Sequence, residues 1–133
     1  MPATAKAAKP SLASIYDELE SILAGFSPPF TGRDSAVRGK RSYVLVSEKE
    51  VVFKGHKKPE LWFAGIIEQK SYIGFYYMPI YCITNMVKPA PGLMKLLKGK
   101  SCFYIKTLTP ELKKDVASAL RAGLTAYKKQ GWL

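Results

Sequence analysis

Apolar residues return every three or four positions near the start of the chain. They begin after Ser11, a residue suited to capping a helix N-terminus, and continue to Phe26, with acidic residues on the opposite side. Pro28 and Pro29 cannot continue such a helix. The pattern therefore predicts an amphipathic helix that ends near Gly25.

The same spacing recurs at the end of the chain. Thr109 is suited to the N-cap position and Pro110 to the first turn, and an apolar stripe then extends to Tyr127. Gly131 is suited to the left-handed conformation that commonly closes a helix. We therefore predict a terminal helix, after which Trp132 packs back on Tyr127.

Between the helices, β-branched and aromatic residues in shorter runs indicate extended segments. The predicted strands cover residues 43–47, 51–54, 61–68, 71–78 and 101–106. Only residues 69–70 separate the third strand from the fourth, so these two should pair as an antiparallel hairpin. Alternation along the last strand points Phe103 and Ile105 into the core, and Tyr104 and Lys106 to the opposite face.

These elements together define a fold class. Residues 30–42 are basic and contain glycine, which predicts a loop, and residues 93–98 predict a short helix closed by Gly99. The expected fold is α+β, a mainly antiparallel sheet of about five strands packed against N- and C-terminal helices. A chain of 133 residues suits one core, so residues 11–133 are predicted to be a single domain. Residues 1–10, MPATAKAAKP, are predicted to be a flexible basic tail.

The net charge of the chain indicates which classes of partner it can attract. The chain has 21 Lys and Arg against 10 Asp and Glu, a net charge of +11. Such a field attracts nucleic acid, an anionic membrane surface or an acidic protein. The basic residues concentrate at 33–41, 54–58 and 95–106, which we interpret as an anion-binding surface. A purely solubilising role for these charges is the alternative.

Aromatic rings accompany the basic segments. Trp62, Tyr72 and Tyr76 lie on predicted strands, as do Tyr104 and Lys106. Rings interleaved with basic groups can hold single-stranded nucleic acid without reading its sequence. The alternative is that these rings are ordinary half-buried sheet residues, and the sequence alone leaves both interpretations open.

The cysteines and the apolar stretches bear on location. Cys82 and Cys102 lie among apolar residues, and no secretory hydrophobic segment precedes them, which predicts thiols in a reducing cytoplasm. The longest uncharged stretch, residues 71–87, contains Gly74 and Pro79 and is shorter than the ~20 residues that a membrane helix needs. No membrane span is expected.

None of the candidate catalytic motifs in the chain is complete. Gly99, Lys100 and Ser101 match the end of a P-loop, but a P-loop leaves a strand and opens a helix, whereas the predicted order here is the reverse. His56, the only histidine, is predicted to lie in a solvated basic turn. No nucleophile and base are recognisable together. We therefore expect a protein that is not an enzyme.

The first helix carries an acidic edge made of Asp17, Glu18 and Glu20. Asp17 and Glu20 can share one side of a helix and offer oxygen ligands to a hard cation such as iron. The alternative is an ordinary solvated helix face, which the positive net charge favours. No cofactor is predicted, and iron is retained as an alternative.

Three segments also carry a family resemblance: YIGFYYMPIY at 72–81, LLKGKSCF at 96–103 and YKKQGW at 127–132. With these, the chain from about residue 61 resembles the YdhG-like domain family of small bacterial proteins. The resemblance implies an α+β fold and a non-enzymatic role. Some members of that family are identified as frataxin-like iron chaperones, whose acidic ridge corresponds here only to Asp17, Glu18 and Glu20.

The sequence therefore predicts a non-enzymatic binding module for an anionic ligand or partner. The candidate binding residues are Tyr76, Met78, Pro79, Lys100, Ser101, Tyr104 and Lys106. The alternatives are a frataxin-like iron chaperone, with Asp17, Glu18 and Glu20 as metal ligands, and a weak binder of single-stranded nucleic acid.

Overall fold

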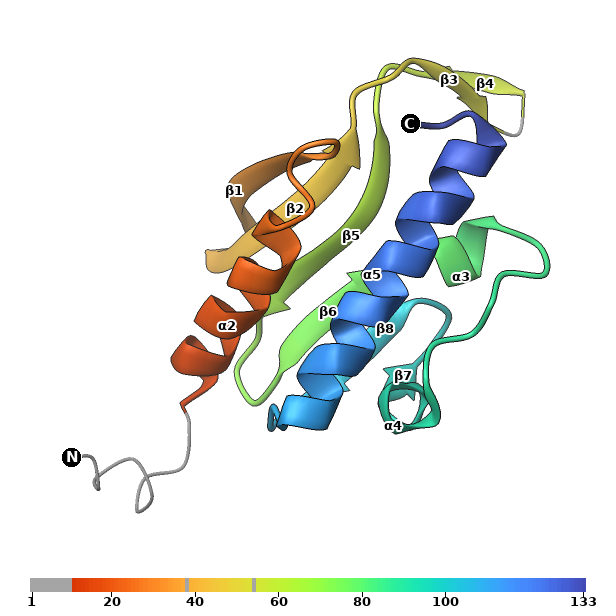
Figure 1. Cartoon of the computed structure of the whole chain (residues 1–133). Helices are drawn as coiled ribbons and strands as arrows, with labels where there is room; N and C mark the ends of the chain where they lie inside the picture. The colour runs from red at the N-terminus through yellow and green to blue at the C-terminus, as the bar shows by residue number, and fades with distance from the viewer. Residues whose placement is uncertain (1–10, 38, 54) are drawn as a thin grey trace.

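The computed structural model describes residues 11–37, 39–53 and 55–133, with an antiparallel sheet lying against two long helices (Figure 1). The helices are α2 (Leu12–Ala24), α3 (Pro79–Cys82), α4 (Pro91–Met94) and α5 (Pro110–Gln130). The strands are β1 (Thr31–Val37), β2 (Lys40–Ser47), β3 (Val51–Phe53), β4 (His56–Lys58), β5 (Leu61–Glu68), β6 (Ile73–Tyr77), β7 (Leu97–Lys98) and β8 (Cys102–Ile105). The tail predicted for residues 1–10 lies outside the described residues.

The two terminal helices begin and end as predicted. The Ser11 side chain accepts a hydrogen bond from the Ser14 N–H at 3.1 Å, which caps α2. The Thr109 hydroxyl accepts one from the Leu112 N–H at 3.1 Å, which caps α5. After α5, Gly131 adopts a φ of 79°, the left-handed region in which glycine carries no Cβ penalty.

The predicted packing of the C-terminus is also confirmed. The Trp132 N–H donates to the Tyr127 carbonyl at 2.9 Å, and the two rings meet edge to face with their centroids 5.2 Å apart. The Ser47 hydroxyl then donates to the Trp132 carbonyl at 2.5 Å. These contacts join the end of the chain to the sheet.

The α+β class is confirmed, with more strands than expected. The main sheet has six strands in the order β1-β2-β5-β6-β8-β7, and β3 and β4 form a separate two-stranded sheet. Each neighbouring pair is antiparallel, including the predicted hairpin of β5 and β6. His56 lies in β4 and not in the predicted turn, because residues 51–53 pair with 56–58.

The prediction of a loop over residues 30–42 is wrong. This segment contains β1 and the start of β2, which pair from Thr31 opposite Val46 to Val37 opposite Lys40. β1 has the sequence TGRDSAV, which lacks the alternation of apolar and polar residues that indicates a strand. Hydrogen bonding to β2 forms this strand, and Gly39, with a φ of 79°, lies in the connecting turn.

The prediction of a helix over residues 93–98 is wrong at its C-terminal end. α4 ends at Met94, and Leu97 and Lys98 form β7, opposite Phe103 and Cys102 of β8. Gly99 does adopt a positive φ, 80°, but it lies in the turn between two strands and does not close a helix. Strand pairing with β8 has overridden a weak local helical preference.

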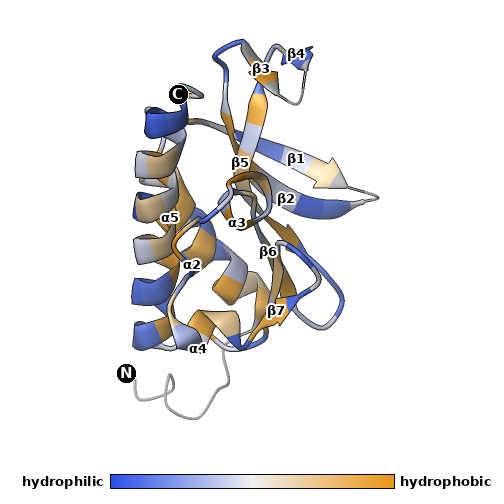
Figure 2. Cartoon of the chain, turned by 90° about the vertical axis from the view of Figure 1, so that its right-hand side faces the viewer, coloured by the Kyte–Doolittle hydropathy of each residue, from blue (hydrophilic) through white to orange (hydrophobic). Residues whose placement is uncertain are grey.

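The hydrophobic core lies between the sheet and the pair of helices α2 and α5, which cover the same face (Figures 1 and 2). Phe63 of β5 stacks on Phe30 with ring centroids 4.0 Å apart and meets Tyr127 of α5 edge to face at 5.1 Å. Phe103 and Ile105 are fully buried there, as the alternation of β8 predicts. We call this the covered face of the sheet.

Candidate functional site

The opposite face of the main sheet, called here the open face, has no helix over it in the described part of the chain (Figure 2). Its side chains come from the alternate positions of the strands that build the core. Tyr76 of β6 and Tyr104 of β8 are partly exposed on it, and Trp62 of β5 is 48% exposed. The two tyrosines belong to the predicted binding residues, so alternation along the strands located them correctly.

Tyrosine rings gather on this face around Gly74 of β6. Tyr72 and Tyr104 are stacked, with ring centroids 3.9 Å apart and planes inclined by 11°. A Cβ at residue 74 would lie 3.1 Å from Cε1 of Tyr76 and 3.7 Å from Cε2 of Tyr72. The missing side chain thus lets the rings lie close to the backbone. We call Tyr72, Tyr76 and Tyr104 the tyrosine cluster.

The phenols of Tyr72 and Tyr76 are held in the neutral form. Burial, followed by the hydrogen bond with the Cys102 thiol, raises the pKa of Tyr76 to about 12. The hydrogen bond with Tyr104, followed by burial, raises the pKa of Tyr72 to about 12. At physiological pH these rings therefore add no negative charge, so an anion can approach them.

Next to the tyrosine cluster the open face is hollowed. The hollow has a volume of about 100 Å³, and we call it the Gly65 hollow after the glycine of β5 that it contains. It is lined by Ser35, Ser42, Val44, Trp62, Gly65, Ile67 and Tyr76. Apart from Tyr76, these residues were not among the predicted binding residues. The sequence signal that could have indicated the hollow was Gly65, because a glycine inside a strongly apolar strand often marks the close approach of a ligand or another backbone.

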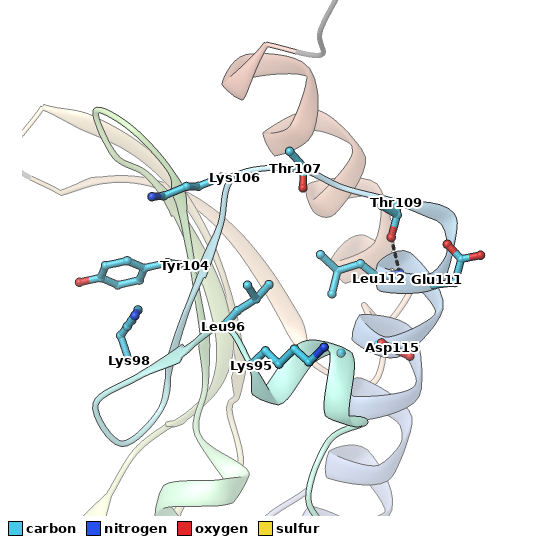
Figure 3. Close-up of a pocket in the computed structure, with 11 residues that line it drawn as sticks. Lys95, Leu96, Lys98, Tyr104, Lys106, Thr107, Thr109, Glu111, Leu112 and Asp115 are labelled. Atoms are coloured by element: carbon cyan, nitrogen blue, oxygen red, sulfur yellow. Dashed lines mark hydrogen bonds between the residues drawn. The ribbon is translucent and has the colours of Figure 1, made fainter.

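Lysines border the open face where β7 and β8 end. Lys98, Lys100 and Lys106 are exposed. Lys98 and Lys106 point to the same side as Tyr104 and away from α5 (Figure 3). The Lys100 ammonium lies 5.7 Å from the ring centre of Tyr81. We call these lysines the basic edge; two of them, Lys100 and Lys106, were predicted binding residues.

A larger cleft of about 450 Å³ lies behind the basic edge, between α4, β8 and the start of α5 (Figure 3). Its lining includes Lys98 and Lys106 of the basic edge together with Lys95, and also Glu111 and Asp115, so its charge is mixed. The hydroxyl of Thr109 is already used to cap α5. The two carboxylates make the α5 side of the cleft less favourable to an anion than the side formed by Lys98 and Lys106.

Three other predicted binding residues, Met78, Pro79 and Ser101, take part in packing or in backbone hydrogen bonds. Pro79 is buried at the start of α3, where its Cγ would be 2.9 Å from a Cβ at Gly123 of α5. Met78 is half-buried, and its N–H donates to the Phe63 carbonyl at 3.0 Å. Ser101 is partly exposed, and its carbonyl accepts from the Tyr77 N–H at 2.9 Å. The Met-Pro turn therefore serves the packing of α3 on α5, and the structure does not bring it to the tyrosine cluster.

Arg33 and Arg41 of segment 33–41 are held in ion pairs, which leaves their charges less available to an anion. Arg33 pairs with Glu48 at 3.0 Å and with Glu60 at 2.7 Å. Arg41 pairs with Asp17 at 3.2 Å and Glu68 at 3.1 Å, and its guanidinium lies 4.0 Å from the Tyr16 ring centre. Arg38 and Lys54 lie outside the described residues. The basic edge of 95–106 thus remains the best placed of the predicted basic segments.

The acidic residues proposed as metal ligands are not brought together. Asp17 pairs with Arg41, and Glu18 pairs with Lys113 of α5. Glu20 lies instead beside Asp34 of β1; burial, and then this neighbouring carboxyl, raises the pKa of Glu20. Among the described residues, no group of three or more His, Cys, Asp or Glu is placed to hold a metal ion.

Comparisons of the chain with protein families, with curated proteins and with solved structures give no match. The resemblance to the YdhG-like family therefore stays a prediction. Within the part of the chain that the structure describes, the helices are too short or too polar to cross a bilayer. The chemistry of the site itself is therefore the basis for inferring its function.

Proposed function

We propose that this chain is a non-enzymatic binding module for an anionic ligand, and that the ligand is single-stranded nucleic acid held on the open face. The observation that carries the proposal is the position of the tyrosine cluster and Trp62 beside the basic edge. Single strands bind to surfaces that combine aromatic rings for the bases with cations for the phosphates.

The rings of the open face suit unpaired bases. Tyr76 and Tyr104 come from neighbouring strands, β6 and β8, and Trp62 comes from β5 on the other side of β6. Rings on neighbouring strands can receive successive bases of a strand laid across the sheet. Base stacking on such rings tolerates any sequence, because every base has a π-face.

The basic edge supplies the charge that these rings lack. Lys98, Lys100 and Lys106 are exposed where β7 and β8 end, and the net charge of the chain is +11. Phosphates bound there would release counterions, so affinity should fall as salt rises. Stacking alone would leave affinity nearly independent of salt.

The experiment is fluorescence anisotropy with a labelled single-stranded oligonucleotide at several salt concentrations. We expect log affinity to fall with log salt by roughly 0.7 for each contacted phosphate. Replacing Lys100 and Lys106 with Gln should flatten that slope. Tyr104→Ala should weaken binding by about 1 to 3 kcal/mol through lost stacking.

The matched control replaces Lys128 and Lys129 with Gln. These exposed lysines occupy the last turn of α5, on the helix side of the sheet, and the variant removes the same charge. If both double variants flatten the slope equally, the binding is non-specific attraction to a basic protein. Absence of binding at low salt would remove nucleic acid as the ligand.

The expected cytoplasmic location and the YdhG-like resemblance are compatible with this proposal. Cys82 and Cys102 are thiols and do not form a disulfide, which supports a reducing compartment. Iron handling has less support, because the carboxylates of Asp17 and Glu18 are paired with cations. We expect at most weak, non-stoichiometric ferrous binding. A micromolar one-site affinity that disappears in the variant Asp17→Asn/Glu20→Gln would contradict this.

A further inference from the structure

We propose that the Gly65 hollow holds one pyrimidine base of the bound strand, and that the Ser42 hydroxyl donates a hydrogen bond to a carbonyl of that base. This inference rests on the proposed function and names the part of the ligand that the open face selects. Three features support it: the size of the hollow, the hydroxyl of Ser42, which is unpaired among the described residues, and the aromatic and basic residues nearby.

Gly65 contributes backbone and no side chain to the hollow at the centre of the sheet. It is paired with Val44 of β2 on one side and with Tyr76 of β6 on the other. A Cβ at residue 65 would lie 3.0 Å from Cγ1 of Val44 and 3.2 Å from the Tyr43 carbonyl oxygen, so the glycine lets Val44 pack close to β5. The aromatic side chains of Trp62 and Tyr76 contribute to the lining of the hollow, which suits the flat ring of a base.

The size of the hollow favours a single ring. Its volume of about 100 Å³ is that of roughly three water molecules at their share of liquid volume. A six-membered pyrimidine ring can be largely received in this space. The fused rings of a purine are larger, so the hollow favours a pyrimidine.

Ser42 provides the polar group within an otherwise largely apolar lining. The residue is 1% exposed, and its hydroxyl has no hydrogen-bond partner among the described residues. Leaving a buried donor unpaired costs free energy, so native proteins pair nearly all of them. The carbonyl oxygens of thymine and uracil can accept the hydrogen bond that this hydroxyl lacks, once the side chain rotates toward the occupied hollow.

The position of the hollow is consistent with its use by a bound strand. Tyr76 belongs both to the lining of the hollow and to the tyrosine cluster, so a base in the hollow adjoins the stacking surface. Beyond that cluster lies the basic edge for the phosphates. Ser35 of β1, paired with Ser42 of β2, lines the hollow at the edge of the sheet and is exposed.

The experiment compares three labelled probes of equal length: oligo(dT), oligo(dA) and an abasic deoxyribose-phosphate chain. Ser35→Ile places an apolar branched side chain at the edge of the hollow. Ala36→Ile makes a similar change at the next, also exposed, position of β1, which points to the other face of the sheet. Ser42→Ala removes only the hydroxyl.

We expect the wild type to bind oligo(dT) more tightly than oligo(dA). Ser35→Ile should bring the ratio of the two affinities close to one and leave binding of the abasic chain unchanged, whereas Ala36→Ile should preserve the ratio. Ser42→Ala should weaken oligo(dT) binding by about 2- to 12-fold, the range for one neutral hydrogen bond. Its melting temperature should not fall, because the hydroxyl has no partner among the described residues of the free protein.

Other results would overturn the inference. An unchanged oligo(dT) to oligo(dA) ratio in Ser35→Ile, with the salt slope still flattened in the Lys100 and Lys106 variant, would show that the hollow is not used although the proposed function holds. Equal loss of all three probes in Ser35→Ile would mean that the substitution blocks the surface and selects no base. No binding of any probe at low salt would overturn both the inference and the proposed function.

Discussion

The two faces of the main sheet are built from the same strands but differ in chemistry. On β8, Phe103 and Ile105 are fully buried on the covered face, whereas Tyr104 between them is partly exposed on the open face. On β6, Phe75 is buried and its neighbour Tyr76 is only half-buried. On β8 the covered face thus receives phenylalanine and the open face receives tyrosine, while on β6 the covered face also receives Tyr77, which is fully buried. A tyrosine in this protein can therefore lie on either face of the sheet.

Two tyrosines that enter the covered face, Tyr77 and Tyr127, have their hydroxyls paired. The Tyr77 hydroxyl donates to the Ala119 carbonyl of α5, and the Tyr127 hydroxyl donates to the Trp62 carbonyl at 2.7 Å. Burial raises the pKa of both phenols. These hydrogen bonds join α5 to the sheet. A phenol is therefore tolerated in this core where a backbone carbonyl is available to it.

The largest change in the free energy of unfolding is expected on β8, where neighbouring residues lie on the two faces of the sheet. Phe103→Ala removes a fully buried ring and should lower the free energy of unfolding by about 3 to 5 kcal/mol. Tyr104→Ala removes a ring stacked on Tyr72 and should cost only about 0.5 to 1.5 kcal/mol. Urea denaturation of both variants measures the difference. Equal losses would show that the open face is part of the core.

A smaller effect is expected from glycines on the two faces. A Cβ at Gly123 of α5 would lie 2.7 Å from Cε1 of Phe63 and 2.8 Å from the Tyr77 hydroxyl, so Gly123→Ala forces buried rings apart. We expect a net loss of about 1 to 2 kcal/mol, because overpacking outweighs the gain in helix propensity.

Gly74→Ala is the matched substitution on the open face. There the atom nearest to the added Cβ is 3.1 Å away, in the half-buried ring of Tyr76. The stability should change by less than about 0.5 kcal/mol, because replacing a strand glycine with alanine gains about 0.5 to 1 kcal/mol, which offsets the small displacement of that ring. Thermal unfolding of both variants tests this. A stabilised Gly123→Ala would mean that α5 can move off the sheet without cost.

The smallest expected effect lies at the margin of the covered face, where Glu20 of α2 meets Asp34 of β1. Burial and this carboxyl raise the pKa of Glu20 above its ordinary value of 4.5, so folding favours the protonated form. The associated stability is complete below the unfolded pKa and is lost as pH rises through the folded pKa. Ionised Glu20 therefore destabilises the protein at neutral pH.

Glu20→Gln should accordingly raise Tm at neutral pH by roughly 1 to 2 °C, a small effect because the site is open to solvent. The difference from wild type should vanish near pH 3, where Glu20 is protonated. Glu18→Gln, which removes the ion pair with Lys113, is the control and should not raise Tm. A lower Tm for Glu20→Gln at neutral pH would mean that the carboxylate has a cationic partner.

Features that depend on neighbours in the sequence were predictable. Ser11 and Thr109 cap helices, Gly131 closes one, and Phe103 and Tyr104 face opposite sides of the sheet as their alternation requires. Tyr104 and Tyr76 of the candidate site follow from the same alternation. Each of these outcomes is set by backbone geometry over a few residues, which the local sequence encodes directly.

Only the tertiary structure decided which distant segments meet. The strand β1 exists because β2 pairs with it, and β7 exists because β8 does; neither has a strong local signal. Asp17 and Glu18, adjacent on one helix, are paired with cations from different elements, Arg41 of β2 and Lys113 of α5. The Gly65 hollow gathers Ser42, Trp62 and Tyr76 from different strands. Their proximity depends on the register of the sheet, which long-range hydrogen bonding and the burial of one face select together.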